Sequence, residues 1–371
     1  MKQLPETRSR DRTLVETRSV PVGAGPHLHI GYVKEAGRVW VSNTGGTEIT
    51  LLDAATGEPA GAMEVGGGPA HFAFDAGCEN GYIALRTEDA VAVVDPRGPS
   101  VRRKIKLPDG SAPTAIMPAF ERRRVYTLNQ GNSTVTAIDT WTDTVAATIP
   151  VGKDPMWGQP WGSSYKPITR PVGRSHVVNA GSDDVTVFDD ATDTVLGRIE
   201  VGRRPVRNAI FREKGLIYVA NELDGTVTAI RIADDQVVAT VPAGVRPFRM
   251  LPVEAISGRD ELWVLNAGSR AEPDGRVTIL SGTQHQASGQ IEVVDQPANW
   301  VVNPAGMLFV VASRAREMCV INVAEGAVNS GARLSRDPTP GPISGLVYTQ
   351  AQLLFVLNDD ETVSVFAENG A

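Results

Sequence analysis

Residues 206–244 read VRNAIFREKGLIYVANELDGTVTAIRIADDQVVATVPAG, and this stretch carries the pattern that decides the fold. It divides into four runs, VRNAIF, LIYVANELDG, TVTAIRI and VVATVPAG. The runs are rich in β-branched residues and alternate in polarity, and they are too short and of the wrong period for amphipathic helices. Gly, Asn and Asp separate the runs, as expected of turns. The stretch therefore predicts four antiparallel β-strands joined by short connections.

This four-strand unit repeats along the chain, and a proline marks the start of each copy. A repeat of about forty residues that contains only short strands is typical of β-propeller blades, which bury both sheet faces by stacking around a ring. Eight copies predict an all-β fold, an eight-bladed β-propeller with four antiparallel strands per blade. The marker prolines, 42 to 50 residues apart, are Pro26, Pro69, Pro113, Pro155, Pro205, Pro247, Pro297 and Pro342.

The two ends of the chain contain complementary parts of one blade. The last unit reaches Ala371 after only three strands, whereas residues 14–23, LVETRSVPVG, read as a fourth strand that belongs to no unit. We expect this N-terminal strand to complete the last blade, because closure of the ring removes exposed sheet edges. Residues 1–13 are then a flexible tail, and residues 14–371 form a single propeller.

Composition narrows the classes of partner. The formal net charge is −7 and no concentrated basic stretch is visible, which argues against nucleic acid or an anionic membrane as partner. Residues 1–13 lack the apolar segment of an export signal, and no run approaches membrane-spanning length, so we expect a cytoplasmic protein. The sequence does not fix the oligomeric state, and a monomer is plausible. Cys78 and Cys319 fit no zinc or disulfide spacing and are expected to be free thiols.

Two stretches resemble the repeat of the YVTN family of β-propellers. They are VYTLNQGNSTVTAIDTWTDTVAATIPVG at residues 125–152 and IYVANELDGTVTAI at residues 217–230. The resemblance extends over nearly the whole chain after Thr13. It implies the fold without implying one function, because relatives at the level of fold include lactonases, cofactor-bearing electron-transfer subunits and proteins without known chemistry.

The first strand of each unit is expected to line the central channel, with the residues just after the proline near one mouth. Binding sites favour such convergent loop mouths. Aligning the units by the asparagine that ends the second strand places several bulky or polar residues at equivalent channel positions. These residues are His29, His71, Trp157, Arg207, Arg249, Asn299 and Ser344.

Three of the five histidines, His27, His29 and His71, fall at the first-strand starts of adjacent units. Residues two apart on a strand share a face, so His27 and His29 could both face the channel with His71 beside them. Three imidazoles could hold a divalent transition metal, or His29 and His71 could act as catalytic general acid and base. The third interpretation is that they only form hydrogen bonds inside the channel.

Arg207 and Arg249 occupy matching positions in units five and six, across the ring from the histidines. A pair of guanidinium groups suits a carboxylate or a phosphate, which they hold by paired hydrogen bonds. Arg203, Arg204 and Arg246 add positive charge nearby. The competing interpretation of each arginine is a salt bridge between blades.

Aromatic residues could supply the rest of a substrate site. An insertion in the fourth unit contains Trp157 and Trp161, and Trp300 follows a channel position in the seventh unit. They could form an apolar wall for a planar ligand or a hydrophobic plug that packs the centre. The predicted substrate-binding set is Arg207, Arg249, Trp157, Trp161, Asn299, Trp300 and Ser344.

Three functions remain open from the sequence. No Walker loop, GxSxG elbow, HExxH motif or calcium loop is present. The preferred function is a small-molecule enzyme, a lyase, isomerase, cyclase or hydrolase of specialised metabolism, whose anionic and partly apolar substrate lies at the channel mouth. The first alternative is a non-catalytic binding or scaffold propeller. The second is a haem or tetrapyrrole-binding propeller, since channel histidines and arginines also resemble those of the haem-binding propellers of nitrite reductases.

Overall fold

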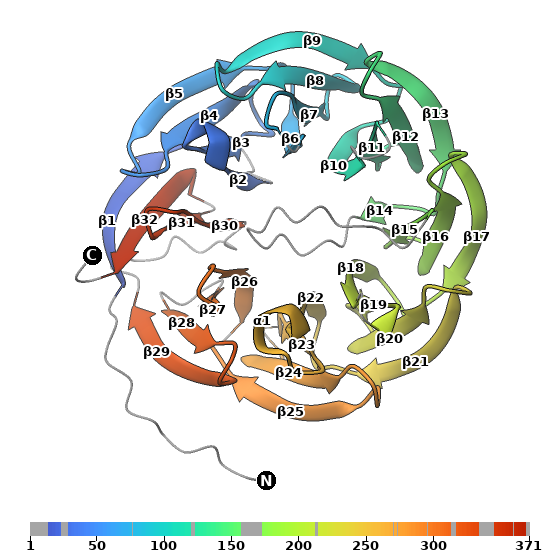
Figure 1. Cartoon of the computed structure of the whole chain (residues 1–371), viewed down its shortest axis with the longest axis vertical. Helices are drawn as coiled ribbons and strands as arrows, with labels where there is room; N and C mark the ends of the chain where they lie inside the picture. The colour runs from blue at the N-terminus through green and yellow to red at the C-terminus, as the bar shows by residue number, and fades with distance from the viewer. Residues whose placement is uncertain are drawn as a thin grey trace.

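The computed structural model describes residues 14–23, 29–75, 77–119, 123–156, 173–211, 214–269, 271–272, 274–294, 296–312, 317–333, 345–358 and 360–368. In this part of the chain, eight four-stranded antiparallel sheets surround a central channel as blades (Figure 1). The predicted all-β, eight-bladed propeller is confirmed. Two short helical turns, η1 (Lys34–Ala36) and α1 (Glu254–Ser257), accompany the described strands. No helix within the described ranges is long and apolar enough to cross a membrane.

Blades one to seven each use four consecutive strands, the first nearest the channel and the fourth at the outer rim (Figure 1). Blade one comprises β2 (Ile30–Val33), β3 (Arg38–Ser42), β4 (Glu48–Asp53) and β5 (Pro59–Glu64), and blade two comprises β6 (Pro69–Phe74), β7 (Gly81–Leu85), β8 (Ala90–Asp95) and β9 (Ser100–Lys106). Blade three comprises β10 (Pro113–Ala119), β11 (Arg124–Asn129), β12 (Thr134–Asp139) and β13 (Thr144–Pro150), and blade four comprises β14 (Pro155–Met156), β15 (Arg174–Asn179), β16 (Asp184–Asp189) and β17 (Thr194–Glu200).

The second half of the ring repeats this order. Blade five comprises β18 (Pro205–Phe211), β19 (Leu216–Asn221), β20 (Thr226–Arg231) and β21 (Gln236–Pro242). Blade six comprises β22 (Pro247–Pro252), β23 (Glu261–Asn266), β24 (Arg276–Ser281) and β25 (Ala287–Glu292). Blade seven comprises β26 (Pro297–Val302), β27 (Met307–Ala312), β28 (Glu317–Asn322) and β29 (Ala327–Arg333).

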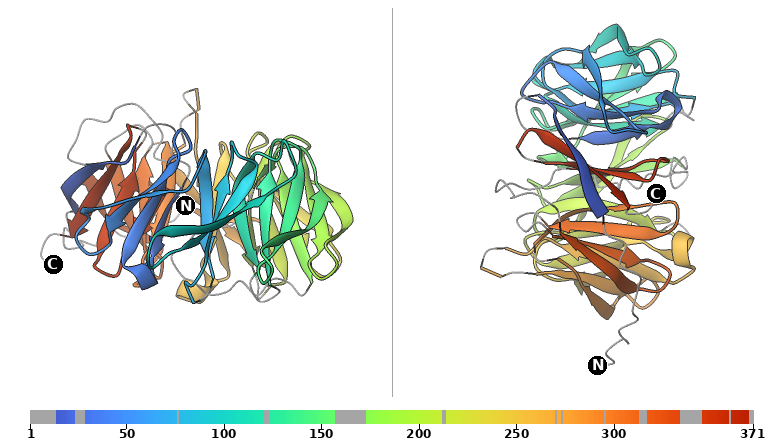
Figure 2. Two further views of the ribbon diagram at one scale, coloured as in Figure 1. Left: turned by 90° about the horizontal axis from the view of Figure 1, so that it is seen from above. Right: turned by 90° about the vertical axis from the view of Figure 1, so that its left-hand side faces the viewer.

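Blade eight joins the two ends of the chain. Its sheet has the order β1–β32–β31–β30, with β1 (Leu14–Pro21) antiparallel to β32 (Thr362–Glu368), so the expected closure by the N-terminal strand is confirmed. The other two strands are β30 (Gly345–Tyr348) and β31 (Leu353–Leu357). Figure 2 shows β1 in blue crossing beside the red strands of this blade. Leu14 and Val20 of β1 are buried, which anchors the closing strand in the core.

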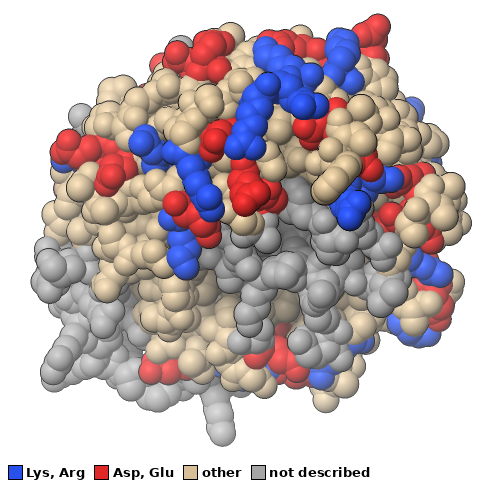
Figure 3. Space-filling view, turned by 45° about the horizontal axis from the view of Figure 1, so that its top comes forward, with Lys and Arg blue, Asp and Glu red and all other residues tan. Residues whose placement is uncertain are grey.

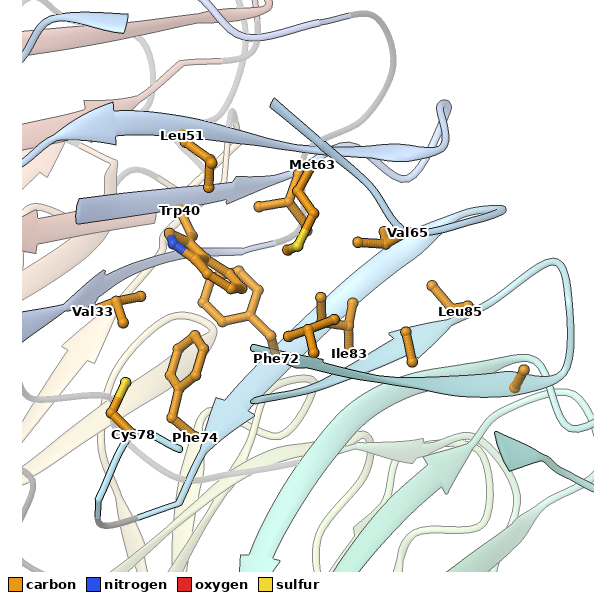
Figure 4. Close-up of a cluster of buried hydrophobic side chains, with 14 residues drawn as sticks. Val33, Trp40, Leu51, Met63, Val65, Phe72, Phe74, Cys78, Ile83 and Leu85 are labelled. Carbon is orange, nitrogen blue, oxygen red and sulfur yellow. The ribbon is translucent and has the colours of Figure 1, made fainter. Parts of the chain in front are cut away.

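The core lies between the blades. Figure 4 shows one such cluster. In it, Trp40 and Met63 of blade one pack against Phe72, Phe74 and Ile83 of blade two. Each fully buried side chain of this size contributes about 1.5–3 kcal/mol, so the stacked faces hold the ring together. The two cysteines of the chain are buried in such clusters and are free, as expected.

Polar contacts also join blade three to blade four and blade four to blade five. The Tyr126 hydroxyl donates to Asp193 Oδ1 at 2.8 Å, and His176 Nε2 lies 3.0 Å from Asp235 Oδ1. Both aspartates occupy left-handed turns, with φ of 55° and 58°, a conformation that Asp tolerates better than most residues. His176 therefore has a structural partner in the neighbouring blade.

The outer strand β9 is rich in basic residues, but carboxylates accompany them. Arg102 lies 2.8 Å from Asp95, and Lys104 lies 2.8 Å from Glu88. On the face in Figure 3, blue and red side chains are interspersed. The basic side chains of β9 are thus partners of neighbouring carboxylates.

Candidate functional site

The inner strands place residues of different blades at one level of the channel. Arg207 of β18 lies opposite Ala220, and Arg249 of β22 lies opposite Leu265; each partner directly precedes the asparagine that ends its strand. Asn299 of β26 lies opposite Val311, which directly precedes Ala312 at the end of its strand. In all three strands a register shift follows the marker proline. Because such a bulge redirects the strand, it sets the direction of the side chain that follows.

His29 and His71 come together from blades one and two. Their rings are stacked, with centroids 4.2 Å apart and an angle of 28° between planes. The ring of Phe72 meets that of His29 edge-on, with centroids 4.4 Å apart. The backbone of His29 is held by Ser42, whose N–H donates to the His29 carbonyl at 3.0 Å. The structure thus brings together the two histidines for which the sequence predicts a catalytic role.

A backbone group from a third blade fixes the ring of His71. The Ile116 N–H donates to His71 Nδ1 at 3.3 Å, and both residues are buried. A neutral imidazole that accepts at Nδ1 carries its proton on Nε2. His71 is therefore a neutral ring in a defined tautomer.

Both histidines are neutral at physiological pH. Burial, with the positive charges of Arg249 and Arg207, lowers the pKa of His29 to about 3. Burial, then His29 and Arg207, lowers the pKa of His71 well below its ordinary value. The arginines of blades five and six therefore act electrostatically on the histidines of blades one and two, across the channel.

The guanidinium groups are themselves desolvated. Burial lowers the pKa of Arg207 to about 10, and burial together with Arg207 lowers the pKa of Arg249 well below its usual value. Both residues nevertheless keep some accessible surface. Arg249 Nε is buried without a hydrogen-bond partner, and among the described residues no carboxylate pairs with Arg249. Arginine remains protonated under such conditions.

The three neighbouring arginines are different. Arg203 pairs with Asp224 at 2.5 Å, Arg204 with Glu222 at 2.7 Å, and Arg246 donates through Nε to Glu222 at 2.8 Å. Two carboxylates therefore compensate most of the charge of the three arginines, so these side chains add less positive charge to the site than expected. All three form salt bridges, and the bridge from Arg246 to Glu222 joins two blades, as the competing interpretation expects.

No protein-family model matches the chain, and no curated protein matches it in sequence. Among solved structures, the computationally designed Ika8 protein is similar with a TM-score of 0.73 and 13% identity, over 96% of this chain and 99% of that chain. BamB from Moraxella catarrhalis is similar with a TM-score of 0.68 and 12% identity, over 96% of this chain and 100% of that chain. At such identities the likeness shows the propeller fold alone.

The remaining predicted site residues divide into two groups. Trp300 is buried in the hydrophobic cluster between blades six and seven, with Trp263 and Leu265, so the prediction that it walls the substrate site is wrong. The alternation of β26 explains this, because Asn299 and Trp300 point to opposite faces of the strand. His27, Trp157, Trp161 and Ser344 lie outside the described residues, and their roles stay predictions.

The described part of the site suits an anion better than a metal cation. Within the described ranges, no group of three or more His, Cys, Asp or Glu residues could hold a metal ion. A metal ion needs ring nitrogens whose in-plane lone pairs converge on it, whereas the stacked rings of His29 and His71 direct these lone pairs side by side. The positive charges of Arg207 and Arg249 also repel a cation. The three-histidine metal site depends on His27 and stays a prediction.

Sequence reasoning missed two features of this level of the channel. Blade three contributes Ala115, opposite Leu128, so a small side chain occupies the position that is polar or bulky in other blades. The alignment of repeats could have found it. The donor of the hydrogen bond from Ile116 to His71 is a backbone N–H, and no pattern of side chains in the sequence predicts such a contact.

Proposed function

We propose that the protein is an enzyme that binds a small organic anion in its central channel, with Arg207 and Arg249 as anchors and His29 as the proton-transfer group. One observation carries the proposal: Arg249, whose Nε is buried without a hydrogen-bond partner, shares one level of the channel with Arg207 and the stacked neutral histidines. Desolvated guanidinium groups bind oxyanions through short, charge-assisted hydrogen bonds.

The electrostatics also support a role for His29 in proton transfer. In the free protein the positive charges of Arg207 and Arg249 help to lower the pKa of His29 to about 3. Burial is the larger cause of this shift, and a bound anion would remove only the part that the two arginines cause. The pKa of His29 would then rise from its value in the free protein, which favours proton transfer by this residue. Lyase, isomerase, cyclase and hydrolase reactions all use such a group. We assign the scaffold to the YVTN family on the repeats at residues 125–152 and 217–230.

The test is equilibrium binding of benzoate, phenylpyruvate and phenyl phosphate, measured by isothermal titration calorimetry. We expect wild-type protein to bind at least one of these probes, R249M to lose it, and R203M to keep it. R203M is the matched control because Arg203 is an arginine of the same region whose charge Asp224 compensates. Equal affinities of wild type and R249M for these probes would show that Arg249 does not bind the anion, and the proposed anion site would be wrong.

A second step separates an enzyme from a binding module. Incubation of the protein with the acids that it binds, followed by mass spectrometry, should reveal a product whose formation H29Q abolishes while binding persists. Binding with no turnover of any bound acid would instead assign the non-catalytic alternative.

A further inference from the structure

The inner strands of the blades are edge strands, because each is paired only with the second strand of its own blade. Alternate N–H groups of such a strand therefore leave the sheet and face the channel. Proline has no N–H, so within a strand it takes positions whose N–H the ladder does not use. Pro118 in β10 and Pro252 in β22 hold such positions, each in unbroken register over the two preceding residues. The two prolines mark the N–H positions that face the channel.

Two residues before each proline, the N–H groups of Ile116 and Met250 leave the sheet on the same side. Ile116 shows this directly, because its N–H donates to His71 Nδ1 of the neighbouring blade at 3.3 Å. The equivalent N–H in blade seven, that of Trp300, donates to Asn299 Oδ1 at 2.9 Å. In these two blades a channel side chain thus supplies the acceptor, either His71 from the preceding blade or Asn299 from the same blade.

Blade six has no such acceptor at either position. The channel residue of the same blade is Arg249, and that of the preceding blade is Arg207. A guanidinium group has five N–H donors and no acceptor, so neither side chain can accept from Met250, whatever its other bonds are. Arg249 also brings a donor of its own, because its Nε is buried without a hydrogen-bond partner. Two adjacent residues therefore offer a main-chain donor and a side-chain donor to an acceptor that these arginines cannot provide.

We propose that the Met250 N–H and the Arg249 guanidinium together form one oxyanion site in the channel, selective for head groups that present only acceptors. The inference rests on the proposed function and adds a main-chain donor, with the class of head group, to the same site. A carboxylate or a phosphate ester offers acceptor oxygens to both donors, whereas a carboxamide turns its NH2 group toward one of them. The sheet holds the Met250 N–H in place, so this donor needs no reorganisation when the anion binds.

The experiment compares M250P with M250A by calorimetry with phenyl phosphate. Both variants lose the buried methionine side chain, but only M250P also loses the N–H. Pro252 shows that this side of β22 accommodates a proline. We expect M250P to bind phenyl phosphate at least tenfold more weakly than M250A, because it lacks one charge-assisted hydrogen bond. Equal affinities of the two variants, with R249M still defective, would overturn the role of Met250 and leave the proposed function intact.

A second arm separates the two classes of oxyanion and tests the preference for acceptors. Benzoate replaces phenyl phosphate as the carboxylate probe, and benzamide is its neutral counterpart of the same shape. We expect M250P to weaken each anion that M250A binds, and we expect no binding of benzamide. Benzamide that binds as tightly as the better of the two anions would overturn the preference for head groups that present only acceptors.

Nuclear magnetic resonance of wild-type protein covers the case that M250P does not fold. The chain has seven methionines, so 15N labelling of methionine alone gives a simple amide spectrum. Met117 is the internal control, since it follows Ile116 in β10 and its N–H therefore faces β11. Saturation with the tighter of the two anions should move the Met250 amide proton downfield, as a new hydrogen bond does, and should leave that of Met117 in place. A bound anion without this shift would overturn the role of Met250, and absence of binding by every probe would remove the proposed function as well.

Discussion

Blades five and six carry two kinds of arginine. The channel arginines, Arg207 and Arg249, lie on inner strands, and the rim arginines, Arg203, Arg204 and Arg246, lie on the connections that lead into those strands. Each rim arginine has a carboxylate partner, whereas burial and like charge lower the pKa of Arg249. Residues of one type, only a few positions apart, thus differ in their surroundings, because the rim arginines form salt bridges and Arg249 has a buried Nε without a hydrogen-bond partner.

The backbone explains why the rim arginines are structural. Arg204 and Arg246 have φ of 51° and 55° and directly precede marker prolines, and Gly68 adopts the same left-handed region before Pro69. A non-glycine residue is strained in this conformation, by about 1 kcal/mol or more. The same conformation recurs before other marker prolines, at Ala112, Asp154 and Gln296, so it belongs to the turn itself. The bonds to Glu222 hold the side chains of Arg204 and Arg246 at this turn.

The largest expected effect is on binding by the channel arginines. R249M should weaken phenyl phosphate binding about 100-fold, because each charged hydrogen bond contributes about 1.5–3 kcal/mol. Its stability to urea should be equal to or above that of wild type, since the substitution removes a desolvated cation beside another. R246M should show the reverse, with lower stability and intact binding. Loss of phenyl phosphate binding in R246M would show that the rim arginines also bind the anion, and the proposed difference between rim and channel arginines would be wrong.

The second effect concerns the carboxylate of the rim. E222Q should lower the free energy of unfolding by about 2 kcal/mol, because two arginines lose the buried group that compensates them. Urea denaturation followed by tryptophan fluorescence measures this change. D224N is the control; its partner Arg203 is mostly exposed, so the loss should stay below about 1 kcal/mol. Equal losses in both variants would show that burial of Glu222 is unimportant.

These two sets also show what the sequence can and cannot predict. The repeat predicted the fold and the closing strand, and the register of the inner strands gives Arg207 and Arg249 equivalent positions in their blades, because strand register follows from the pattern of the repeat. It could not predict which arginines have partners, since ion pairs depend on side-chain directions between blades. The sequence also placed Trp300 wrongly at the channel. Neighbouring residues on a strand face opposite sides of the sheet, so Trp300 lies in the core beside the channel position of Asn299.

The third effect tests the support of the histidine pair. H71F keeps a ring to stack on His29 but leaves the buried Ile116 N–H without its acceptor, which costs about 1–3 kcal/mol. H71N offers Oδ1 near the position of Nδ1 and should keep the bond. Amide hydrogen exchange at Ile116 measures the difference directly and should be faster in H71F than in H71N. Equal protection would show that the Ile116 bond is dispensable.

The smallest effect is a dependence of stability on pH that separates channel from rim. The pKa of His29 is lowered to about 3, so the folded state stays neutral there while the unfolded chain takes up a proton below about pH 6.5. Stability is therefore lost as pH falls from 6.5, by about 1 kcal/mol for His29 between pH 6 and pH 5. The pKa of the rim carboxylate Asp224 is lowered, mainly by hydrogen bonds from Arg203, so its contribution is lost only below its unfolded pKa, near 4.

The pH ranges in which His29 and Asp224 affect stability can both be measured in one series of urea denaturations from pH 7.5 to pH 3.5. H29Q should lose less stability than wild type between pH 6.5 and pH 5, and the two curves should run parallel above pH 7. D224N should lie below wild type by less than about 1 kcal/mol and run parallel to it above about pH 4.5, and the two curves should approach each other at lower pH. Phenyl sulfate does not titrate in this range, and by compensating Arg207 and Arg249 it should flatten the wild-type curve toward that of H29Q. A stability of wild type that does not change between pH 6.5 and pH 5 would mean that His29 is solvated and keeps its ordinary pKa. The proposed difference in electrostatic environment between the channel and the rim would then be wrong.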